Sequence, residues 1–491
     1  MKNNHFNAFG ILLILTLMLG LVSCSEDDEI VPSQDVEFGV SPTSMSFPAS
    51  GGNSIINVNN NGEWDISTDA DWLTFSNQSA TQSSKITLTA MANSDTTART
   101  ATLMVNGIEN SQEIQVTQEG AEPEPVEQEI TFAIPPDNTG ISDLGSADFA
   151  DQMIIGWNLG NSLEAVGEEG ETSWNNPVVT QRLIDSVKAA GFNAVRIPIA
   201  WSKFSDEASF TIEDAWMNRV EEVVNYVISN DMYAIINIHW DGGWMQPTYE
   251  EEDYVNQRLD TMWTQIATNF RDYDDHLLFA GTNEVLVEGD YGTPTEEYYT
   301  VQNGFNQTFV NSVRSTGGKN AYRYLVVQGF NTNIDHTVNF FEMPEDVDIA
   351  ENRLMVEVHY YDPYNFALNE DDSVWQWGND AEDASLTAGW ANEDHVDNQF
   401  QRMQTNFVDE GVGVILGEYG AIARDVEGHE VYRLDYLQYV THSAAEHGMV
   451  SFYWDNGDID ENGFGIFDRS TGETLYPEVV ETIINAAQSA E

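Results

Sequence analysis

Beyond about residue 130, the chain alternates between short apolar segments and longer segments with apolar residues at helical spacing. The segments that predict strands are Ile154–Trp157, Ala194–Ile197, Ala234–Ile238, Leu277–Gly281, Tyr324–Gln328, Leu354–Val358, Val412–Leu416 and Val450–Trp454. Between the first two, Asn176-Pro177 is expected to open a helix and Gly191 to end it. Strands that alternate with helices favour a parallel α/β architecture, and eight of them fit a (β/α)8 TIM barrel over residues 130–491. An open doubly wound sheet is less favoured, because no glycine-rich phosphate turn follows the first strand.

From residue 37 to residue 118 the pattern changes to short alternating runs separated by turn residues. These runs are Ser44–Phe47, Ser54–Val58, Trp64–Ser67, Lys85–Ala90, Ala101–Val105 and Glu113–Thr117. Asn-Gly pairs at 61–62 and 106–107 mark turns between them. The pattern predicts a small all-β sandwich of immunoglobulin type before the barrel. Residues 119–129, which include Glu-Pro-Glu-Pro, predict a stiff charged linker.

Polar and aromatic residues, and one proline, lie at the ends of the predicted barrel strands or just after them. In a parallel barrel the ends of all strands meet at one face, so these residues are candidates for a single site. They are Asn158, Asn161, Arg196, Pro198, His239, Trp240, Asn283, Glu284, His359, Tyr361, Glu418 and Trp454. Each has an ordinary structural explanation by itself, but their gathering at one rim favours a functional site.

The chemistry of this set is that of glycoside hydrolysis. Glu284 and Glu418 supply two carboxyl groups, one to protonate the leaving oxygen and one to act below the sugar ring, and the aromatic residues can stack on sugars. No serine or cysteine nucleophile constellation is present, and His-x-x-x-His spacing for zinc is absent. We therefore expect no cofactor and no metal. Carboxyl groups about 5–5.5 Å apart would give retention, whereas about 6.5–9.5 Å would give inversion.

The charge of the chain restricts its partners. It has 82 acidic and 18 basic residues, for a net charge of −64. Nucleic acid and anionic membrane surfaces are therefore unsuitable partners. A neutral polysaccharide is a suitable one, and a salty medium would screen the self-repulsion.

The N-terminus has the pattern of a lipoprotein precursor. The apolar run Gly10–Val22 is too short for a transmembrane helix and ends in Leu21-Val22-Ser23-Cys24, which resembles a bacterial lipobox. Residues 1–23 would then be the signal peptide, and Cys24, the only cysteine, the lipidated residue. In the tether 24–36, the acidic run Glu26–Glu29 resembles the surface-export tag of Bacteroidota lipoproteins. We expect a monomer anchored in the outer membrane and exposed at the cell surface; a tether facing the periplasm is the alternative.

The first domain resembles the BACON domain of Bacteroidota glycan-processing proteins. The resemblance rests on Trp64-Asp-Ile, Ala70-Asp71-Trp72-Leu73, Ala98-Arg99-Thr100-Ala101 and Ile114-Gln115-Val116-Thr117-Gln118. A carbohydrate-binding role is attached to that family. The aromatic residues of this segment mostly fall on strand patterns where they would be core residues, which favours a spacer over a binding module; they are Phe38, Phe47, Trp64, Trp72 and Phe75.

From about Asp143 to the end, the chain resembles glycoside hydrolase family 5, and most of all its subfamily 4 of endo-β-1,4-glucanases and xyloglucanases. The motifs are Gly156-Trp-Asn-Leu-Gly-Asn-Ser-Leu-Glu, Gly191-Phe-Asn-Ala-Val-Arg-Ile-Pro, Ile236-Asn-Ile-His-Trp-Asp-Gly-Gly-Trp, Val358-His-Tyr-Tyr-Asp-Pro-Tyr-Asn-Phe, Leu416-Gly-Glu-Tyr-Gly and Tyr453-Trp-Asp-Asn-Gly. By this resemblance Glu284 is the acid/base and Glu418 the nucleophile. Glu284 would be held protonated by the neighbouring charge of Glu418.

The resemblance also implies how the other residues bind substrate. Asn283 would hold the sugar 2-hydroxyl, Arg196 would keep Glu418 ionised, and Tyr361 would donate its hydroxyl to Glu418. His239 and His359 would line the same subsite with Trp454 as its stacking floor, and Asn161 and Trp240 complete the predicted substrate-binding set.

Two positions depart from the family pattern. Val285 replaces the usual proline of Asn-Glu-Pro, and Trp240 replaces the second histidine of a frequent His-His pair. Neither change removes a catalytic group. We also expect about half of the loop tryptophans to be packing residues and the rest to be glucan platforms; they are Trp174, Trp201, Trp240, Trp244, Trp375, Trp377 and Trp390.

The sequence thus predicts a retaining, endo-acting hydrolase of β-1,4-glucosidic bonds, with xyloglucan or a related, cellulose-like glucan as substrate. A β-mannanase and a mixed-linkage glucanase are alternatives that would use the same catalytic residues. A glycan-binding lipoprotein without catalysis is a further alternative, but it predicts a missing carboxylate, and both glutamates are present.

Overall fold

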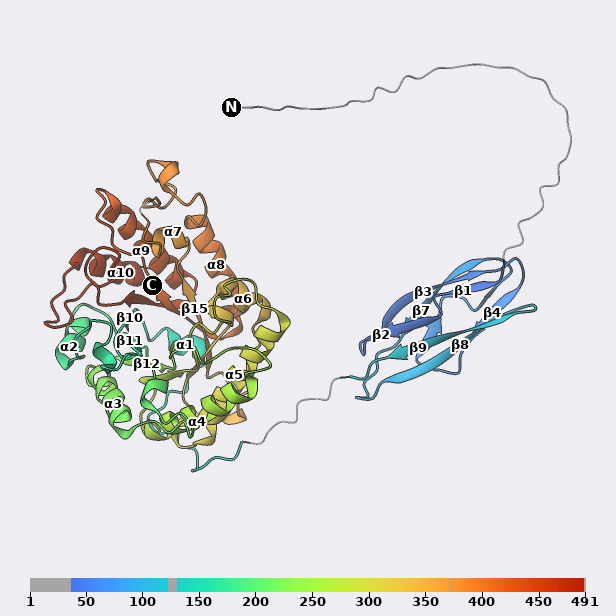
Figure 1. Ribbon diagram of the computed structural model, residues 1–491, viewed down its shortest axis with the longest axis horizontal. Helices are drawn as coiled ribbons and strands as arrows, with labels where there is room; N and C mark the ends of the chain where they lie inside the picture. Colours follow the sequence, from blue (N-terminus) through green and yellow to red (C-terminus); the bar gives the residue numbers. More distant parts are fainter. Residues whose placement is uncertain (1–36, 122–129, 372, 490–491) are drawn as a thin grey trace, which may run out of the picture. The chain divides into compact units, whose positions relative to one another are not determined.

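The computed structural model describes residues 37–121, 130–371 and 373–489, and the chain divides into two compact units, residues 1–128 and 129–491 (Figure 1). The predicted signal peptide 1–23, the tether 24–36 with Cys24, and most of the linker 119–129 lie outside the described residues. Among the described helices, none combines the length and the apolar character needed to cross a lipid bilayer.

The first unit is a sandwich of two sheets, as the alternating pattern predicted. One sheet has the strand order β1-β3-β7-β5 and the other β2-β9-β8-β4-β6. The strands are β1 (Gly39–Ser41), β2 (Ser44–Phe47), β3 (Gly52–Asn59), β4 (Trp64–Ser67), β5 (Leu73–Phe75), β6 (Ser79–Ala80), β7 (Ser84–Ala90), β8 (Arg99–Gly107) and β9 (Ser111–Gln118). Sequence analysis did not identify β1, β5 and β6, because strands of two or three residues are too short to show alternation.

The aromatic residues of the sandwich belong to its core. Phe47, Trp64 and Trp72 are buried between the sheets, and Phe38 and Phe75 pack against them half-buried. The guanidinium of Arg99 lies over the Trp72 ring, 4.5 Å from its centroid. The prediction that these side chains serve as core is confirmed, and this unit therefore presents none of them as an exposed sugar platform.

The second unit is a closed barrel of eight parallel strands in sequence order, in which the last strand pairs with the first. The strands are β10 (Gly156–Leu159), β11 (Ala194–Ile197), β12 (Tyr233–Asn237), β13 (Leu277–Ala280), β14 (Leu325–Gln328), β15 (Leu354–Tyr360), β16 (Gly413–Tyr419) and β17 (Met449–Asp455). All eight predicted strands are present, and the TIM-barrel prediction is confirmed.

Helices surround the strands, as Figure 1 shows. They are α2 (Gln181–Ala189), α3 (Asp214–Ile228), α4 (Glu252–Asn269), α5 (Glu296–Ser315), α6 (Ile334–Phe340), α8 (Glu393–Asn406), α9 (His429–Glu446) and α10 (Pro477–Gln488), and the short α7 (Tyr364–Ala367) follows β15. Their apolar faces pack on the outward residues of the strands, which form one continuous core with them.

The inward residues of the strands form a separate core that is closed at one end. The short helix α1 (Ser146–Ala150) places Phe149 between Tyr233 and Tyr324, at the end of the barrel where the strands begin. Ser146 Oγ accepts a hydrogen bond from the N–H of Gly413, the first residue of β16. Because this end is plugged, the opposite end, where the strands finish, is the one left for a site.

Helix α2, between the first two barrel strands, differs from its predicted start. It begins at Gln181, with the Thr180 hydroxyl accepting from the Leu183 N–H at 3.4 Å, and not at Asn176-Pro177. Asn176 is buried instead, and its amide donates to the carbonyls of Asn161 and Asn456 at 2.8 Å each. An Asn-Pro pair can start a helix or lie in a loop. Here it lies in a loop, because the Asn176 side chain is bound by residues far from it in the chain. The predicted stop at Gly191, with φ of 111°, agrees with the structure.

Candidate active site

The alternation of strand side chains aims a polar set into the mouth of the barrel. In β11, Ala194 and Arg196 point inward while Val195 and Ile197 join the outer core. In β15, Met355 lies in the inner core, so Glu357 and His359 point the same way. The pairing of β15 with β16 shifts register between Val358 and His359. Both strands continue past this shift, β15 to Tyr360 and β16 to Tyr419, so His359 and Glu418 lie within the strands and not after them as the sequence predicted.

Glu418 is buried in β16 and has a partner on each carboxylate oxygen. Arg196 Nη1 donates to Oε1 at 3.0 Å, and the Tyr361 hydroxyl donates to Oε2 at 3.1 Å. Burial raises the pKa of Glu418, while the positive charges of His359 and Arg196 act to lower it. These contacts favour the carboxylate form against the cost of burying it.

Glu284 lies in the loop after β13 and is exposed. Its Oε1 lies 2.7 Å from Nδ1 of His359, and that nitrogen is 3.7 Å from Oε2 of Glu418. One carboxylate oxygen of each glutamate and one nitrogen of His359 lie within 4.8 Å of one another. This separation belongs to the shorter of the two carboxyl spacings, the one that lets a carboxylate attack the sugar directly.

Arg196 connects the two sides of the site. Besides Glu418, its guanidinium donates to the side-chain oxygens of Asn158 at 3.0 Å and Asn283 at 2.6 Å. The Asn283 carbonyl is thereby occupied, which turns its amide NH2 toward other partners. An acceptor such as a sugar hydroxyl fits that remaining donor.

His239 and Trp454 form a flat aromatic pair at the mouth. Their rings lie 6.0 Å apart and nearly parallel, with 7° between the planes. Burial and the charges of Arg196 and His359 hold the pKa of His239 well below its ordinary value, so this imidazole is neutral. Gly160 lies against the Trp454 indole, where an added Cβ would come within 2.9 Å of the ring. A neutral face of this kind suits a sugar ring.

Asn161 and Trp240 lie on flanking loops. Asn161 follows β10 with φ of 56°, and its N–H donates to Glu164. Trp240 follows β12 and is 55% exposed, with its indole over Gly243. Neither belongs to the hydrogen-bonded set that joins Glu284 to Glu418, so these two predicted residues are placed at the margin of the site.

Comparison with known proteins gives the family. A sequence model described as Cellulase (glycosyl hydrolase family 5) matches residues 160–460, which is more than half of the chain. The chain belongs to glycosyl hydrolase family 5. A model of the viral BACON domain matches residues 37–121.

Relatives of this family 5 hydrolase include a xyloglucan-specific endo-β-1,4-glucanase of Bacteroides ovatus, 39% identical over 94% of this chain and 93% of the relative. Among solved structures, the Bacteroides ovatus family 5 xyloglucanase in complex with a XXXG heptasaccharide has a TM-score of 0.69 at 38% identity, covering 92% of this chain and 100% of that one. A broad-specificity endoglucanase of Bacteroides salanitronis has a TM-score of 0.67 at 41% identity, covering 71% of this chain and 96% of that one.

The loop tryptophans of this family 5 hydrolase divide between packing and exposure. Trp201 and Trp377 are buried, Trp244 and Trp375 are half-buried, and the remaining three are exposed: Trp174, Trp240 and Trp390. The guanidinium of Arg258 lies over the Trp244 ring, 4.5 Å from its centroid, so this tryptophan is a packing residue of the loop.

Sequence analysis missed two buried carboxylates of the barrel mouth. Glu357 forms an ion pair with Arg196 at 2.8 Å and lies 3.2 Å from His359. Asp455 binds the Trp157 indole N–H at 3.0 Å and Arg469 at 2.9 Å. Asp455 directly follows the predicted strand Val450–Trp454 and was not chosen as a candidate, whereas Glu357 stands inside the apolar segment Leu354–Val358 and not at its end. A charged residue inside such a segment was the available signal.

Two trios of side chains in the described structure are close enough to share a metal ion. One is Asp274, Asp275 and His276, near the start of β13 and so at the end of the barrel away from the site. The other is Glu284, His359 and Glu418. In the second trio Glu284 and His359 are already in hydrogen-bond contact, so we interpret it as an acid–base group and not as a ligand set.

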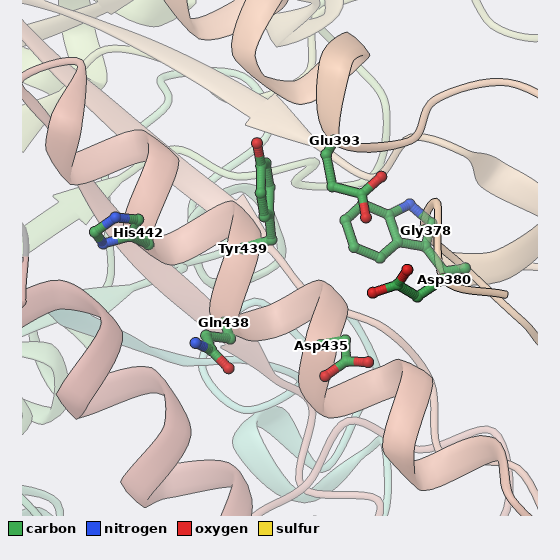
Figure 2. A pocket seen from close by; sticks show the side chains of 8 residues that line it. Gly378, Asp380, Glu393, Asp435, Gln438, Tyr439 and His442 are labelled. Carbon is green, nitrogen blue, oxygen red and sulfur yellow. The ribbon is translucent and has the colours of Figure 1, made fainter.

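A cavity of about 240 Å³ lies elsewhere on the hydrolase, between α8, α9 and the loop 377–380 (Figure 2). Three carboxyl groups face it, those of Asp380, Glu393 and Asp435. Glu393 already accepts hydrogen bonds from the Asn379 N–H at 3.0 Å, which fastens the loop. None of the residues that line this cavity belongs to the site at the barrel mouth.

Proposed function

We propose that this family 5 hydrolase cuts internal β-1,4-glucosidic bonds of xyloglucan with retention, through a covalent glycosyl-enzyme on Glu418. The observation that carries the proposal is the pair of carboxyl groups at the mouth, with oxygens within 4.8 Å of each other. Support for the substrate comes from the xyloglucan-specific relative, which aligns with 94% of this chain.

In the first step Glu418 attacks the anomeric carbon, and the bond to the leaving oxygen breaks as Glu284 protonates that oxygen. Arg196 and Tyr361, which contact Glu418, hold its carboxylate in line for attack. Asn283 donates to the 2-hydroxyl, an interaction that strengthens as charge develops on the sugar. His239 and Trp454 provide the flat face below the ring.

In the second step water replaces the cleaved chain. Glu284, now a carboxylate, takes a proton from that water, and the water oxygen bonds to the anomeric carbon while the bond to Glu418 breaks. Two inversions give net retention, and each glutamate returns to its starting state.

The variants Glu284→Ala and Glu418→Ala test which glutamate is the acid/base and which is the nucleophile. We expect each to lower kcat on xyloglucan by about a thousandfold or more. On an aryl glycoside with a good leaving group, added azide should give the β-glycosyl azide from the Glu284 variant and the α-glycosyl azide from the Glu418 variant. A Glu418→Ala enzyme that hydrolyses at the parent rate would overturn the mechanism.

The substrate is tested by reducing-end release from xyloglucan, carboxymethylcellulose, mixed-linkage glucan and glucomannan, with residues 129–491. Tenfold or greater preference for xyloglucan, about 1.4 kcal/mol in the transition state, supports the proposal. A preference for mixed-linkage glucan or for glucomannan would be compatible with the same catalytic mechanism. It would identify the enzyme as a mixed-linkage glucanase or a β-mannanase instead. Binding without hydrolysis of any of them would favour the non-catalytic glycan-binding lipoprotein.

We further propose that the chain is an outer-membrane lipoprotein with Cys24 as the anchor and the tether 24–36 exposing it at the cell surface. The support is the lipobox-like Leu21-Val22-Ser23-Cys24 and the acidic run that follows it. Metabolic labelling with palmitate should mark the parent and not Cys24→Ala. Protease added to intact cells should remove the parent protein, and protection from it would indicate a periplasmic location.

The BACON-like unit is proposed to act as a spacer between the anchor and the barrel. Its aromatic residues are core residues, which is the support for this assignment. Affinity electrophoresis of residues 37–121 in xyloglucan gels should give no retardation. Retardation would indicate a binding module.

A further inference from the structure

Glu357 is a third carboxylate of the barrel mouth, fully buried behind the two glutamates that face the substrate. It lies 2.8 Å from Arg196 Nε and 3.2 Å from His359 Nε2, and it accepts from Gln328 Nε2 at 2.7 Å. Burial would raise the pKa of Glu357, but the Arg196 charge and the contact with His359 lower it to about 2. Glu357 is therefore a carboxylate at any working pH, and it can only accept hydrogen bonds.

The backbone next to Glu418 is shaped around this carboxylate. A Cβ at Gly417 would come within 2.0 Å of Glu357 Oε1, so any side chain at Gly417 would displace it. The pairing of β16 with β17 is irregular at the same point, between Leu416 and Tyr419. The glycine before Glu418 thus makes room for Glu357.

Because Glu357 only accepts, the contact at 3.2 Å requires the hydrogen to sit on Nε2 of His359. The other nitrogen, Nδ1, then faces Glu284 Oε1 at 2.7 Å with either a lone pair or a second hydrogen. A contact this short between a nitrogen and a carboxyl oxygen contains a proton.

We propose that Glu357 is a positioning residue: it fixes His359 with its hydrogen on Nε2, so that His359 Nδ1 and Glu284 share the one proton that catalysis uses. This inference rests on the proposed function. The proton passes from Glu284 to the leaving oxygen as the glycosidic bond breaks, and the attacking water returns one proton to the pair. His359 gains and loses none over the cycle.

The charged and titratable groups around the shared proton lie in β11, β15 and β16 and just after β12 and β15. Glu357 and Glu418 are negative, and Arg196 is positive. His239 is neutral because burial holds its pKa well below the ordinary value. Tyr361 is neutral because burial holds its pKa well above the ordinary value. Burial would lower the pKa of His359, but the Glu418 charge and the contacts with Glu284 and Glu357 raise it to about 9. Removing the charge of Glu357 should therefore weaken the hold on the shared proton.

Glu357→Gln tests the inference through the pH profile. We expect the alkaline limb of kcat/KM to move to lower pH by about one unit or more, with kcat reduced and KM for xyloglucan nearly unchanged, since Glu357 does not line the surface that meets substrate. The matched control is Glu171→Gln. Glu171 is a buried glutamate outside the site, and its carboxylate lies 2.8 Å from Arg219 in an ion pair. The control should lose stability without shifting the limb. An unshifted limb in folded Glu357→Gln would overturn the proposal.

A second measurement needs neither activity nor the Glu357→Gln variant. In the parent chain labelled with 15N-histidine, two-bond couplings should show His359 with its hydrogen on Nε2 and with Nδ1 titrating at a pKa of about 9. The signal is assigned by its loss in His359→Gln. A neutral His359 with its hydrogen on Nδ1 alone would overturn the proposal even if the Glu284 and Glu418 variants behave as proposed, so the two failures can be told apart.

Discussion

Arg196 is the single residue on which most of the site depends. It is fully buried, and its guanidinium reaches Glu418, Asn283 and Glu357 at the same time. Only the planar fork of arginine presents donors in three directions from one group, whereas a lysine ammonium is a point charge on a flexible stem. Position 196 therefore needs arginine for its geometry as well as for its charge.

Arg196→Lys should keep the positive charge and lose the fork. We expect kcat to fall by about a hundredfold or more, as for the loss of a preorganised donor near developing charge. Steady-state kinetics on xyloglucan measures this. The control is Arg314→Lys. Arg314 is equally buried but lies outside the site, and its guanidinium donates two hydrogen bonds of 2.7 Å to Asp346. Equal activity of Arg196→Lys and the parent would show that charge alone is required.

Glu164 gives a prediction for stability against pH. Burial raises its pKa to about 7, although the N–H groups of Asn161 and Ser162 and the Arg469 charge act in the opposite direction. Since this folded value lies above the ordinary 4.5, the stability linked to the proton is present below about pH 4.5 and is lost as pH rises through about 7.

Glu164→Gln removes that titration. The melting temperature of the variant minus that of the parent should increase between pH 4.5 and pH 7, by the equivalent of about 3 kcal/mol, and then level off. Thermal unfolding across pH 4 to 8 measures the difference. A difference that does not change with pH would show that Glu164 does not titrate in this range.

The loop after β12 is the element that carries Trp240 to the rim, and Asp241 fastens it. Its carboxylate accepts from the backbone N–H groups of Trp201 and Ser202 and from the indole N–H of Trp244, each at 2.8 Å. The Arg258 guanidinium lies over the face of the Trp244 ring. The loop is therefore held by hydrogen bonds to the buried Asp241 carboxylate and not by its own secondary structure.

Asp241→Asn should loosen this loop, because an amide NH2 cannot accept from the Trp244 indole and leaves this half-buried donor unpaired. We expect KM for xyloglucan to rise up to about tenfold, within the 1–3 kcal/mol cost of such a donor, with a smaller change in kcat. The matched control, Asp137→Asn, alters an exposed carboxylate that accepts from the Thr139 N–H at 2.9 Å. A fall in kcat at constant KM would contradict a role in holding the loop.

The charge of the whole chain sets its response to salt. A net charge of −64 exerts self-repulsion that favours expansion of the chain, and salt screens it over about 10 Å at 0.1 M. We expect the melting temperature at pH 7 to rise by several degrees between about 10 mM and 0.5 M NaCl. The same series near the sequence pI of 4.1 is the control, because there the net charge is close to zero and the effect should vanish. A melting temperature that is flat or falls with salt at pH 7 would contradict the prediction.

The sequence by itself determined the barrel, the sandwich and most of the site residues. The eight apolar segments must be buried, and parallel strands of one barrel bring their ends to one face, so Glu284 and Glu418 were expected to meet although 134 positions separate them. The aromatic residues of the sandwich were likewise assigned to its core by alternation alone.

Only the tertiary structure decided how these groups are paired. The bulges that draw His359 and Glu418 into β15 and β16, the start of α2 at Gln181, and the burial of Glu357 beneath Gly417 depend on contacts between segments far apart in the chain. The periodicity of apolar residues predicts which face of a strand is buried, because each apolar side chain is stabilised by leaving water whatever its partners are. It does not report which buried charge faces which, because that depends on register and on the few tenths of an ångström that separate a hydrogen bond from a clash.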